Sequence, residues 1–416
     1  MSGVDVMAIT DDLTGAADSG GYFTDRGQAL TIFTGEDGAF QPVEGRIVSV
    51  NLSSRNVTGA EAKRRHYELC RRLAGGPERL YMKKIGTGFR GRDAFELEGM
   101  LEAMPGYLCF LIDNAPDLGT FTLYGHQYCE GQILTKSLYA KDPIFPPTRS
   151  YIPEILGQDT ALSVALVDLD AVKGGDLLEA VGRAVEAGNR IIVFDAVTAE
   201  DTLHIIETLQ PHYPKVFWTG SLGLADALAS YLYGPPHPRP AVRRDIRSVC
   251  FCASAYETAR RQIAYSARRG LKVVRLDVDA LRDGDTGAVA RTVDEMIGAD
   301  GDGNVLLAPC VERWSGKPGT SEAIMEAFGA CAPAVCGALD FQRLVVIGGE
   351  TAQRIFRAMD IRRISLSGKP EPGIAEGVID DGDLAGREFA LKGGSVGSDQ
   401  ALEKMLCRWG GEEEET

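Results

Sequence analysis

Short apolar segments alternate with helical patterns along almost the whole chain, and this alternation restricts the fold more than any other feature of the sequence. Val4–Ile9, Arg46–Val50 and Leu80–Ile85 have the composition of buried strands, and helical patterns cover residues 60–74 and 93–103. Such an alternation is typical of β-α units around a mainly parallel sheet. We therefore predict an α/β fold in which helices flank each sheet.

The chain of 416 residues is longer than one typical domain. Residues 234–240 (G-P-P-H-P-R-P) contain four prolines in seven positions, which neither a helix nor a central strand accommodates. We predict a linker there, between an N-terminal domain (1–233) and a C-terminal domain (241–416), each a mainly parallel sheet flanked by helices. Residues 114–160, rich in Pro, Gly and aromatic residues, predict an elaborated loop region near a site.

The composition indicates a cytoplasmic enzyme. The hydrophobic share of 44% and the charged share of 25% are ordinary globular values. The net charge of -15 argues against binding to nucleic acid or to an anionic membrane, and no apolar run approaches the roughly 18 residues of a membrane span. The nine cysteines, an odd number without a C-x-x-C pair, predict reduced thiols rather than a zinc site or a disulfide framework. Homo-oligomerisation stays open.

Two adjacent acids, Asp11 and Asp12, follow the first predicted strand. Open α/β sheets bind their ligands at the carboxyl ends of such strands. Both side chains can accept hydrogen bonds from substrate hydroxyls, and one can act as a general base. Capping of the next helix would explain one acid but not two in a row. We therefore take both as candidate catalytic residues.

Four basic residues are expected at the same edge of the sheet: Arg55, Lys83, Lys84 and Arg90. Arg55 follows the second predicted strand, and the two lysines end the third. Together these side chains can hold a carboxylate or a phosphate. For each of them taken alone, a surface ion pair is the simpler interpretation.

Gly86–Gly91 matches G-x-G-x-x-G between a predicted strand and a predicted helix, and Asp113 ends the next strand. An acid about 20 residues after such a turn binds the ribose of a dinucleotide, so an NAD-dependent oxidoreductase is a serious hypothesis. Two observations weaken it. The helix is expected to begin only at Asp93, and Lys83 and Lys84 place charge at the end of the strand.

Three turns of small residues in the second domain each follow a predicted strand and precede a helix. Their sequences are C-A-S-A at 252–255, G-G-E-T-A at 348–352 and K-G-G-S-V-G at 392–397. Backbone N–H groups at such turns bind phosphates. One turn alone is more often a tight connection, but three in one domain favour a nucleotide or phosphate site. A Walker A loop does not occur in the sequence.

The order of these motifs resembles that of the four-carbon acid sugar kinases. The resemblance rests on D-D-L-T-G-A at 11–16, S-R at 54–55, K-x-x-x-x-x-R-G at 84–91, G-H-x-Y at 125–128, D-P at 142–143, D-A-V-T at 195–198, G-S-x-G-L-A at 220–225, G-G-E-T-A at 348–352 and L-K-G-G-S-V-G at 391–397. It implies an N-terminal sugar-acid domain and a C-terminal ATP domain, with Mg²⁺-dependent phosphoryl transfer to a substrate hydroxyl between them.

The resemblance also implies roles for single residues. Asp11 or Asp12 would orient or deprotonate the hydroxyl, Arg55 and Lys84 would hold the carboxylate, and Arg90 would steady the transferring phosphate. Lys83 is an additional candidate for substrate binding. The implied ATP contacts are Ser254, Gly348, Gly349, Glu350, Thr351 and Gly397. The metal ligands are unknown.

The chain departs from the family pattern at two places on the substrate side. The family usually reads K-x-D-S-T-x-R-G-N, but residues 84–92 read K-I-G-T-G-F-R-G-R, without the Asp and the Ser. Residues 118–122 lack the Arg of the usual G-R-x-T. These losses leave open a changed substrate, or a non-catalytic ATP-binding relative, beside the oxidoreductase.

Overall fold

The computed structural model describes residues 6–35, 47–76, 78–142, 146–237, 243–299, 301, 303–310 and 319–409. Part of the predicted linker (238–240), the first residues of two predicted strands (Val4, Asp5 and Arg46) and Pro143 of the D-P motif lie outside them. The chain divides into two compact units. Unit 1 consists of the residues up to Gln28 and of Gly35–Pro236, and unit 2 consists of Ala29–Thr34 and the residues from His237 onward.

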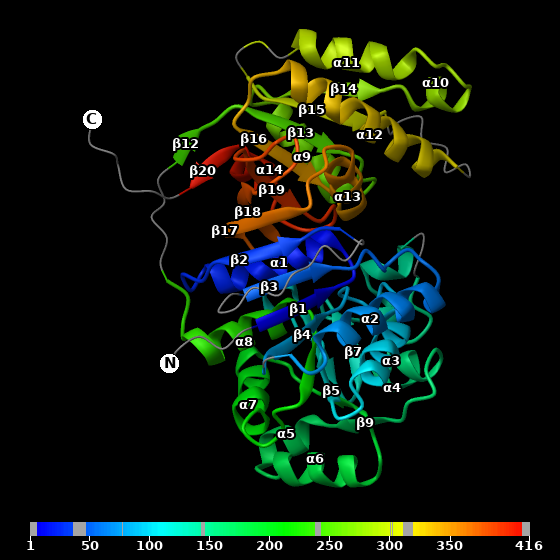
Figure 1. Ribbon diagram of the computed structural model, residues 1–416, viewed down its shortest axis with the longest axis vertical. Helices are drawn as coiled ribbons and strands as arrows, with labels where there is room; N and C mark the ends of the chain where they lie inside the picture. Colours follow the sequence, from blue (N-terminus) through cyan, green and yellow to red (C-terminus); the bar gives the residue numbers. More distant parts are fainter. Residues whose placement is uncertain are drawn as a thin grey trace. The chain divides into compact units, whose positions relative to one another are not determined.

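Unit 1 is built on a parallel sheet with the strand order β3-β1-β4-β11-β5-β10-β9. Figure 1 shows β3, β1 and β4 side by side. The strands are β1 (Val6–Thr10), β3 (Ile47–Asn51), β4 (Leu80–Lys84), β5 (Leu108–Ile112), β9 (Val164–Val167), β10 (Ile191–Phe194) and β11 (Val216–Gly220). Every residue of β1, β3, β4, β10 and β11 is buried. Continuous buried runs of this kind are expected where helices cover both faces of a parallel sheet.

Helices cover the unit 1 sheet on both of its faces. They are α1 (Leu13–Thr24), α2 (Gly59–Leu73), α3 (Asp93–Ala103), α4 (Ile152–Gly157), α5 (Leu169–Gly174), α6 (Leu177–Glu186), α7 (Ala199–Leu209) and α8 (Leu222–Tyr233). α1 packs on α8, and α2 packs on α3. The chain leaves β1 toward β3 on one side and then returns across β1 to β4, so right-handed connections place α1 and α2 on opposite faces.

Residues 114–160 form more regular structure than the predicted loop region. An antiparallel sheet of β6 (Thr120–Leu123), β7 (His126–Cys129) and β8 (Gln132–Ile133) lies there, with short helices η1 (Pro116–Leu118), η2 (Leu134–Lys136) and η3 (Leu138–Lys141). Phe121 and Tyr128 are cross-strand partners whose rings stack with centroids 5.0 Å apart. Aromatic cross-strand pairs stabilise a hairpin, which explains why an aromatic-rich segment is ordered as strands.

Unit 2 has a mixed sheet with the order β14-β15-β13-β16-β19-β18-β17-β2. The strands are β2 (Leu30–Phe33), β13 (Ser248–Cys252), β14 (Lys272–Leu276), β15 (Val305–Pro309), β16 (Arg343–Ile347), β17 (Arg363–Glu371), β18 (Ile374–Ile379) and β19 (Glu388–Lys392). β13 to β16 and β19 run parallel, whereas β2, β17 and β18 pair antiparallel. A separate pair joins β12 (Arg243–Asp245) and β20 (Cys407–Trp409).

The helices of unit 2 are α9 (Glu257–Ala267), α10 (Val278–Arg282), α11 (Ala288–Ala299), α12 (Thr320–Ala338), α13 (Gly349–Ala358) and α14 (Ala401–Met405). A core cluster, including Ile263, Leu306 and Met405, lies between the sheet and α9 and α14. The mainly parallel strands and flanking helices of both units confirm the predicted α/β class. No helix among the described residues has the length and apolar composition of a membrane span.

Strand β2 comes from the N-terminal segment of the chain but belongs to the sheet of unit 2. Its residues pair antiparallel with the start of β17, from Arg363 opposite Phe33 to Leu366 opposite Leu30. The N–H of Thr34 extends the pairing by donating to the carbonyl of Arg362 over 2.9 Å. The predicted first domain (1–233) includes this segment, because a four-residue strand does not reveal its partner.

Candidate functional site

The candidate substrate residues meet where the direction of the chain across the unit 1 sheet reverses. β1 pairs with β3 on one side and with β4 on the other, in a register that aligns Thr10 with both Asn51 and Lys84. Asp11 and Arg55, which follow β1 and β3, therefore reach the same edge of the sheet as Lys84. Such a reversal point at the carboxyl ends of the strands is the general ligand position in open α/β sheets.

Asp11 and Arg55 form a two-pronged ion pair at this edge. Arg55 Nε lies 2.7 Å from Oδ2 of Asp11, and Nη2 lies 3.1 Å from Oδ1. The Asp11 side chain is completely buried. Burial by itself raises the pKa of Asp11, but the charges of Arg55 and Lys83 outweigh it and lower the pKa to about 2. Asp11 is therefore a firmly charged carboxylate and a weak base.

Asp12 caps helix α1. Capping is the structural role considered above for one of the two acids. Its Oδ1 accepts the N–H of Gly15 over 2.8 Å, and its Oδ2 accepts the hydroxyl of Thr14 over 2.7 Å. The same Oδ2 lies 2.9 Å from Nη1 of Arg55. Asp12 thus combines the cap with the ion pair, and the guanidinium of Arg55 is shared between two carboxylates.

Lys83 and Lys84 point to opposite faces of β4, as neighbouring strand residues must. Lys83 is fully buried, and its Nζ lies 2.7 Å from Oε2 of Glu96 in α3. Lys84, also buried, faces helix α1, where its Cγ lies 3.7 Å from the position of a Cβ on Gly15. Its Nζ donates to the carbonyl of Ile85 over 2.7 Å.

Under Asp11 lies a buried polar group that the sequence analysis missed, consisting of Ser54, His66, Asp93 and Glu96. The Ser54 hydroxyl lies 2.5 Å from Oε1 of Glu96, and Nε2 of His66 lies 3.7 Å from Oε2. Burial lowers the pKa of His66 to about 4, so its ring is neutral at pH 7. Burial, together with the charges of Glu96 and Asp11, raises the pKa of Asp93 well above its usual value. The only sequence signal for this group was the pair of acidic residues in the first turn of α3.

Arg90 lies on the glycine turn between β4 and α3 but has its own partners. Its guanidinium lies over the ring of Tyr139 at 4.7 Å, and its Nη1 is 3.6 Å from Oδ2 of Asp142. The backbone of the turn itself passes close to Asp11, because a Cβ on Gly91 would lie 3.4 Å from Oδ2. The turn is therefore next to the Asp11–Arg55 pair, while the Arg90 side chain is anchored to η3.

The structure does not support the dinucleotide interpretation of Gly86–Gly91. β11 lies between β4 and β5, so the turn and Asp113 do not follow neighbouring strands. Helix α3 begins at Asp93, beyond the third glycine, as expected from the sequence. Asp113 is buried and accepts a hydrogen bond from the amide of Gln127. Asp113 therefore does not offer an exposed carboxylate to a ribose beside this turn.

The three small-residue turns of unit 2 follow three adjacent strands. β16 lies between β13 and β19, and the register aligns Cys252 with Ile347 and Ile347 with Lys392. The turns therefore lie side by side at the carboxyl edge of the sheet. The N–H of Gly348 joins two of them by donating to the carbonyl of Lys392 over 2.9 Å. The predicted contacts Gly348, Gly349, Glu350 and Thr351 lie at the start of α13.

The first and third turns touch directly through a glycine. A Cβ on Gly394 would lie 2.0 Å from Oγ of Ser254, a distance that no side chain tolerates. Gly397 has φ of 91°, and a Cβ there would meet the side chain of Ala401 at 2.7 Å. Ser254 and Gly397, predicted as ATP contacts, thus belong to one cluster, and glycine is required in it for close approach and for backbone conformation.

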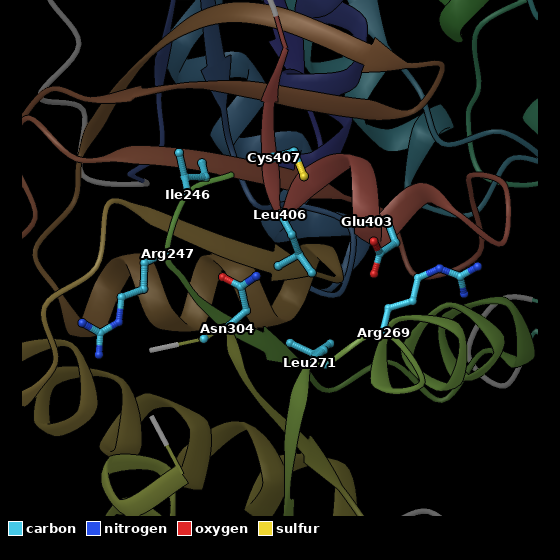
Figure 2. Close-up of a pocket in the computed structure, with 10 residues that line it drawn as sticks. Ile246, Arg247, Arg269, Leu271, Asn304, Glu403, Leu406 and Cys407 are labelled. Carbon is cyan, nitrogen blue, oxygen red and sulfur yellow. The ribbon is translucent and has the colours of Figure 1, made fainter. Parts of the chain in front are cut away.

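A separate cavity of about 390 Å³ opens at the amino ends of the parallel strands of unit 2 (Figure 2). Arg247, Leu271 and Asn304, which line it, directly precede β13, β14 and β15. The glycine turns follow the strands, so this cavity lies away from them and is not part of the candidate nucleotide site. Among the described residues of both units, no group of three or more His, Cys, Asp or Glu side chains is arranged to hold a metal ion.

Comparison with known proteins gives matches for both units. Residues 6–228 match the sugar-binding N-terminal domain family, and residues 249–402 match the nucleotide-binding C-terminal domain family. A D-threonate kinase of Cupriavidus necator is 27% identical over 410 residues, which cover 95% of this chain and 96% of the relative. A D-erythronate kinase of Heliobacterium modesticaldum is 28% identical over 263 residues, covering 62% of this chain and 59% of the relative.

The fold also matches a solved structure. A protein of Salmonella typhimurium superimposes with a TM-score of 0.79 at 20% identity, covering 96% of this chain and 98% of that protein. This likeness extends over both units and shows that the two proteins share a fold.

Proposed function

Because the chain belongs to the four-carbon acid sugar kinase family, we propose that it transfers the γ-phosphoryl group of ATP to a hydroxyl of a small sugar acid. Unit 1 would bind the acid and unit 2 the nucleotide. The observation that carries the proposal is the convergence of three small-residue turns on adjacent strands of unit 2, in the part of the chain that matches a nucleotide-binding domain.

The contacts in unit 1 support distinct roles for its charged residues. Asp11 is too weak a base to take a proton readily, so it positions Arg55 and the substrate hydroxyl. Arg55 already pairs with two carboxylates, which favours Lys84 as the main partner of the substrate carboxylate. Nζ of Lys84 donates to the carbonyl of Ile85, and an ammonium group has three donors. Lys83 supports Asp11 from the interior.

Arg90 would steady the transferring phosphate after leaving Asp142, an ion pair that is long at 3.6 Å. Mg²⁺ would enter with ATP, since it is usually held by nucleotide phosphates and one or two carboxylates rather than by a complete protein cage. The ion would neutralise phosphate charge during transfer, as phosphoryl transfer generally requires.

The test is Mg²⁺-dependent ADP release with D-threonate, D-erythronate and their enantiomers, with a control that contains no acid. We expect release with one acid and much less with its stereoisomers, because fixed charged groups recognise hydroxyl geometry. ATP binding without release for any acid would indicate a non-catalytic relative, consistent with the substituted residues at 86 and 87. Binding of NAD in place of ATP would contradict the proposal. A cytoplasmic location stays a prediction, and homo-oligomerisation stays open.

A further inference from the structure

Lys392, the first residue of the third small-residue turn, is a buried cation. It is the last residue of β19 and is only 1% exposed. Its Nζ donates to the carbonyls of Gly393 over 2.6 Å and Val396 over 3.0 Å. Among the described residues it has no carboxylate within ion-pair distance. Burial lowers its pKa to about 8, which leaves it mostly charged at pH 7.

A buried charge without an opposite partner is costly, so its position calls for a reason beyond packing. The charge of Lys392 faces the inner side of the loop formed by residues 393–397. The charge of Glu371 also acts on Lys392, but Glu371 is itself paired with Lys404 at 2.6 Å. A negative group bound on the outer side of that loop would supply a further counter-charge. The surroundings of Lys392 therefore point to an anion.

The loop is held from inside through its carbonyl groups. Besides Lys392, the amide of Gln262 in α9 donates to the carbonyls of Val396, Gly397 and Ser398 at 2.9–3.2 Å. The carboxylate of Glu371 accepts the N–H of Ser398 over 2.5 Å and so fixes the end of the loop. These contacts turn the carbonyl groups away from the outer surface.

The N–H groups of the loop are left for another partner. Within the described part of the chain, no N–H of residues 393–397 donates to a protein acceptor, and each of these residues is partly exposed. The loop also lies against Ser254 and is joined to Gly348, beside the first N–H groups of α13. Consecutive N–H groups of this kind form an anion-binding concavity.

We propose that residues 393–397 are the phosphate-binding loop of unit 2 and that Lys392 is its positioning residue. The lysine holds the carbonyl groups inward and supplies positive charge beneath the bound phosphates. This inference rests on the proposed function in one respect, namely that the phosphates belong to ATP. It assigns the phosphate end of the nucleotide, and not the adenosine end, to this loop.

The experiment compares the binding of ATP and adenosine to the full-length wild-type protein and to Lys392→Met by titration calorimetry. We expect ATP to bind at least 10-fold more weakly to the variant, while the adenosine affinity stays within about 2-fold. The KM for ATP should rise and the KM for the acid should stay unchanged. Methionine fills a similar volume and removes an unpaired buried charge, so the variant is expected to fold.

Two further variants make the result specific. Lys272→Met removes the same charge from an exposed position at the amino end of β14 and should change neither affinity. Gln262→Leu removes the other inward donor and should repeat the selective loss of ATP binding. Equal losses for ATP and adenosine, or an unchanged ATP affinity, would overturn the assignment of the loop.

The outcome also separates this inference from the proposed kinase activity. If the wild-type protein binds ATP but phosphorylates no acid, the selective loss in Lys392→Met still supports the loop. If the wild-type protein is an active kinase and the variant loses no ATP affinity, the kinase stands and the loop assignment is wrong. Failure of the wild-type protein to bind ATP would overturn both.

Discussion

The guanidinium of Arg55 binds the buried carboxylate of Asp11 through two nitrogens, at 2.7 and 3.1 Å. Paired and fork-shaped contacts of this kind are geometrically specific. Here the pair joins the ends of β1 and β3 and fixes the edge of the sheet at which the substrate residues meet. Because Arg55 is already paired, its positive charge is neutralised before a substrate acid binds.

Replacing Asp11 with Asn should abolish turnover while leaving ATP affinity nearly intact. Asparagine has a similar volume but lacks the charge that holds Arg55. The substitution should therefore disturb the arrangement of the substrate residues in unit 1 and leave unit 2 unaffected. ADP release and ATP titration measure the two effects separately. The control is Asp176→Asn, which changes a half-exposed acid of unit 1 near the start of α6. Unchanged turnover in Asp11→Asn would remove this residue from the mechanism.

The buried pair of Lys83 and Glu96 should contribute strongly to stability only while both partners are present. Glu96→Leu leaves Lys83 charged and unpaired in the interior, which is expected to cost about 3–5 kcal/mol in the free energy of unfolding. The double variant Lys83→Met and Glu96→Leu should recover most of this loss. Denaturant unfolding of the wild type, of each single variant (Lys83→Met and Glu96→Leu) and of the double variant completes the double-mutant cycle. Additive effects of the two substitutions would contradict the pairing.

Asp18 in α1 should make the protein less stable as the pH rises. Burial raises its pKa to about 7, although the charge of Lys84 opposes the shift, and its Oδ1 has no hydrogen-bond partner. The folded protein thus keeps a proton that the unfolded chain loses near pH 4. This stabilisation is complete below pH 3.8 and is lost as the pH rises through about 7.

Thermal unfolding of wild type and Asp18→Asn between pH 4 and 8 tests the prediction. The stability of the variant relative to the wild type should increase as the pH rises to about 7 and stay constant above pH 7. Asp176→Asn again serves as the exposed control and should show no growing difference. A constant difference for Asp18→Asn at every pH would mean that this carboxyl titrates normally.

Gly394→Ala should weaken ATP binding because the new methyl group collides with Ser254. The Cβ position is 2.0 Å from Oγ, so the third turn has to move away from the first. Ser254→Gly in the same chain removes the obstacle and should restore binding, unless the hydroxyl itself contacts ATP. Gly298→Ala is the control, since a Cβ there meets nothing within 4 Å. Normal ATP affinity of Gly394→Ala would show that contact between the turns is dispensable.

The parts of the fold that follow from local pattern were predictable. Continuous apolar runs located β1, β3 and β4, and the start of α3 at Asp93 was expected from its sequence. Strand order was not predictable, because pairing depends on crossovers that leave no trace in local sequence. The position of β11 between β4 and β5 is the clearest case, since it removes the dinucleotide interpretation.

The candidate site was predictable where residues directly follow strands. Asp11, Arg55 and the three turns of unit 2 meet because the carboxyl ends of neighbouring parallel strands share an edge. Residues whose role depends on what lies across from them were missed. Glu96 and Gln262 look like ordinary helix residues, and only the packed structure shows Glu96 beside Lys83 and Gln262 beneath the 393–397 loop.

Strand β2 also determines how this protein can be dissected. Since Ala29–Thr34 belongs to unit 2 while the segments before and after it belong to unit 1, a single cut in the linker releases neither unit intact. A fragment ending at Pro236 would carry β2 away and leave one side of β17 bare, which is a template for aggregation. Separate production of a nucleotide-binding fragment would therefore require residues 29–34 to be grafted onto it, through a designed connection or as an added peptide.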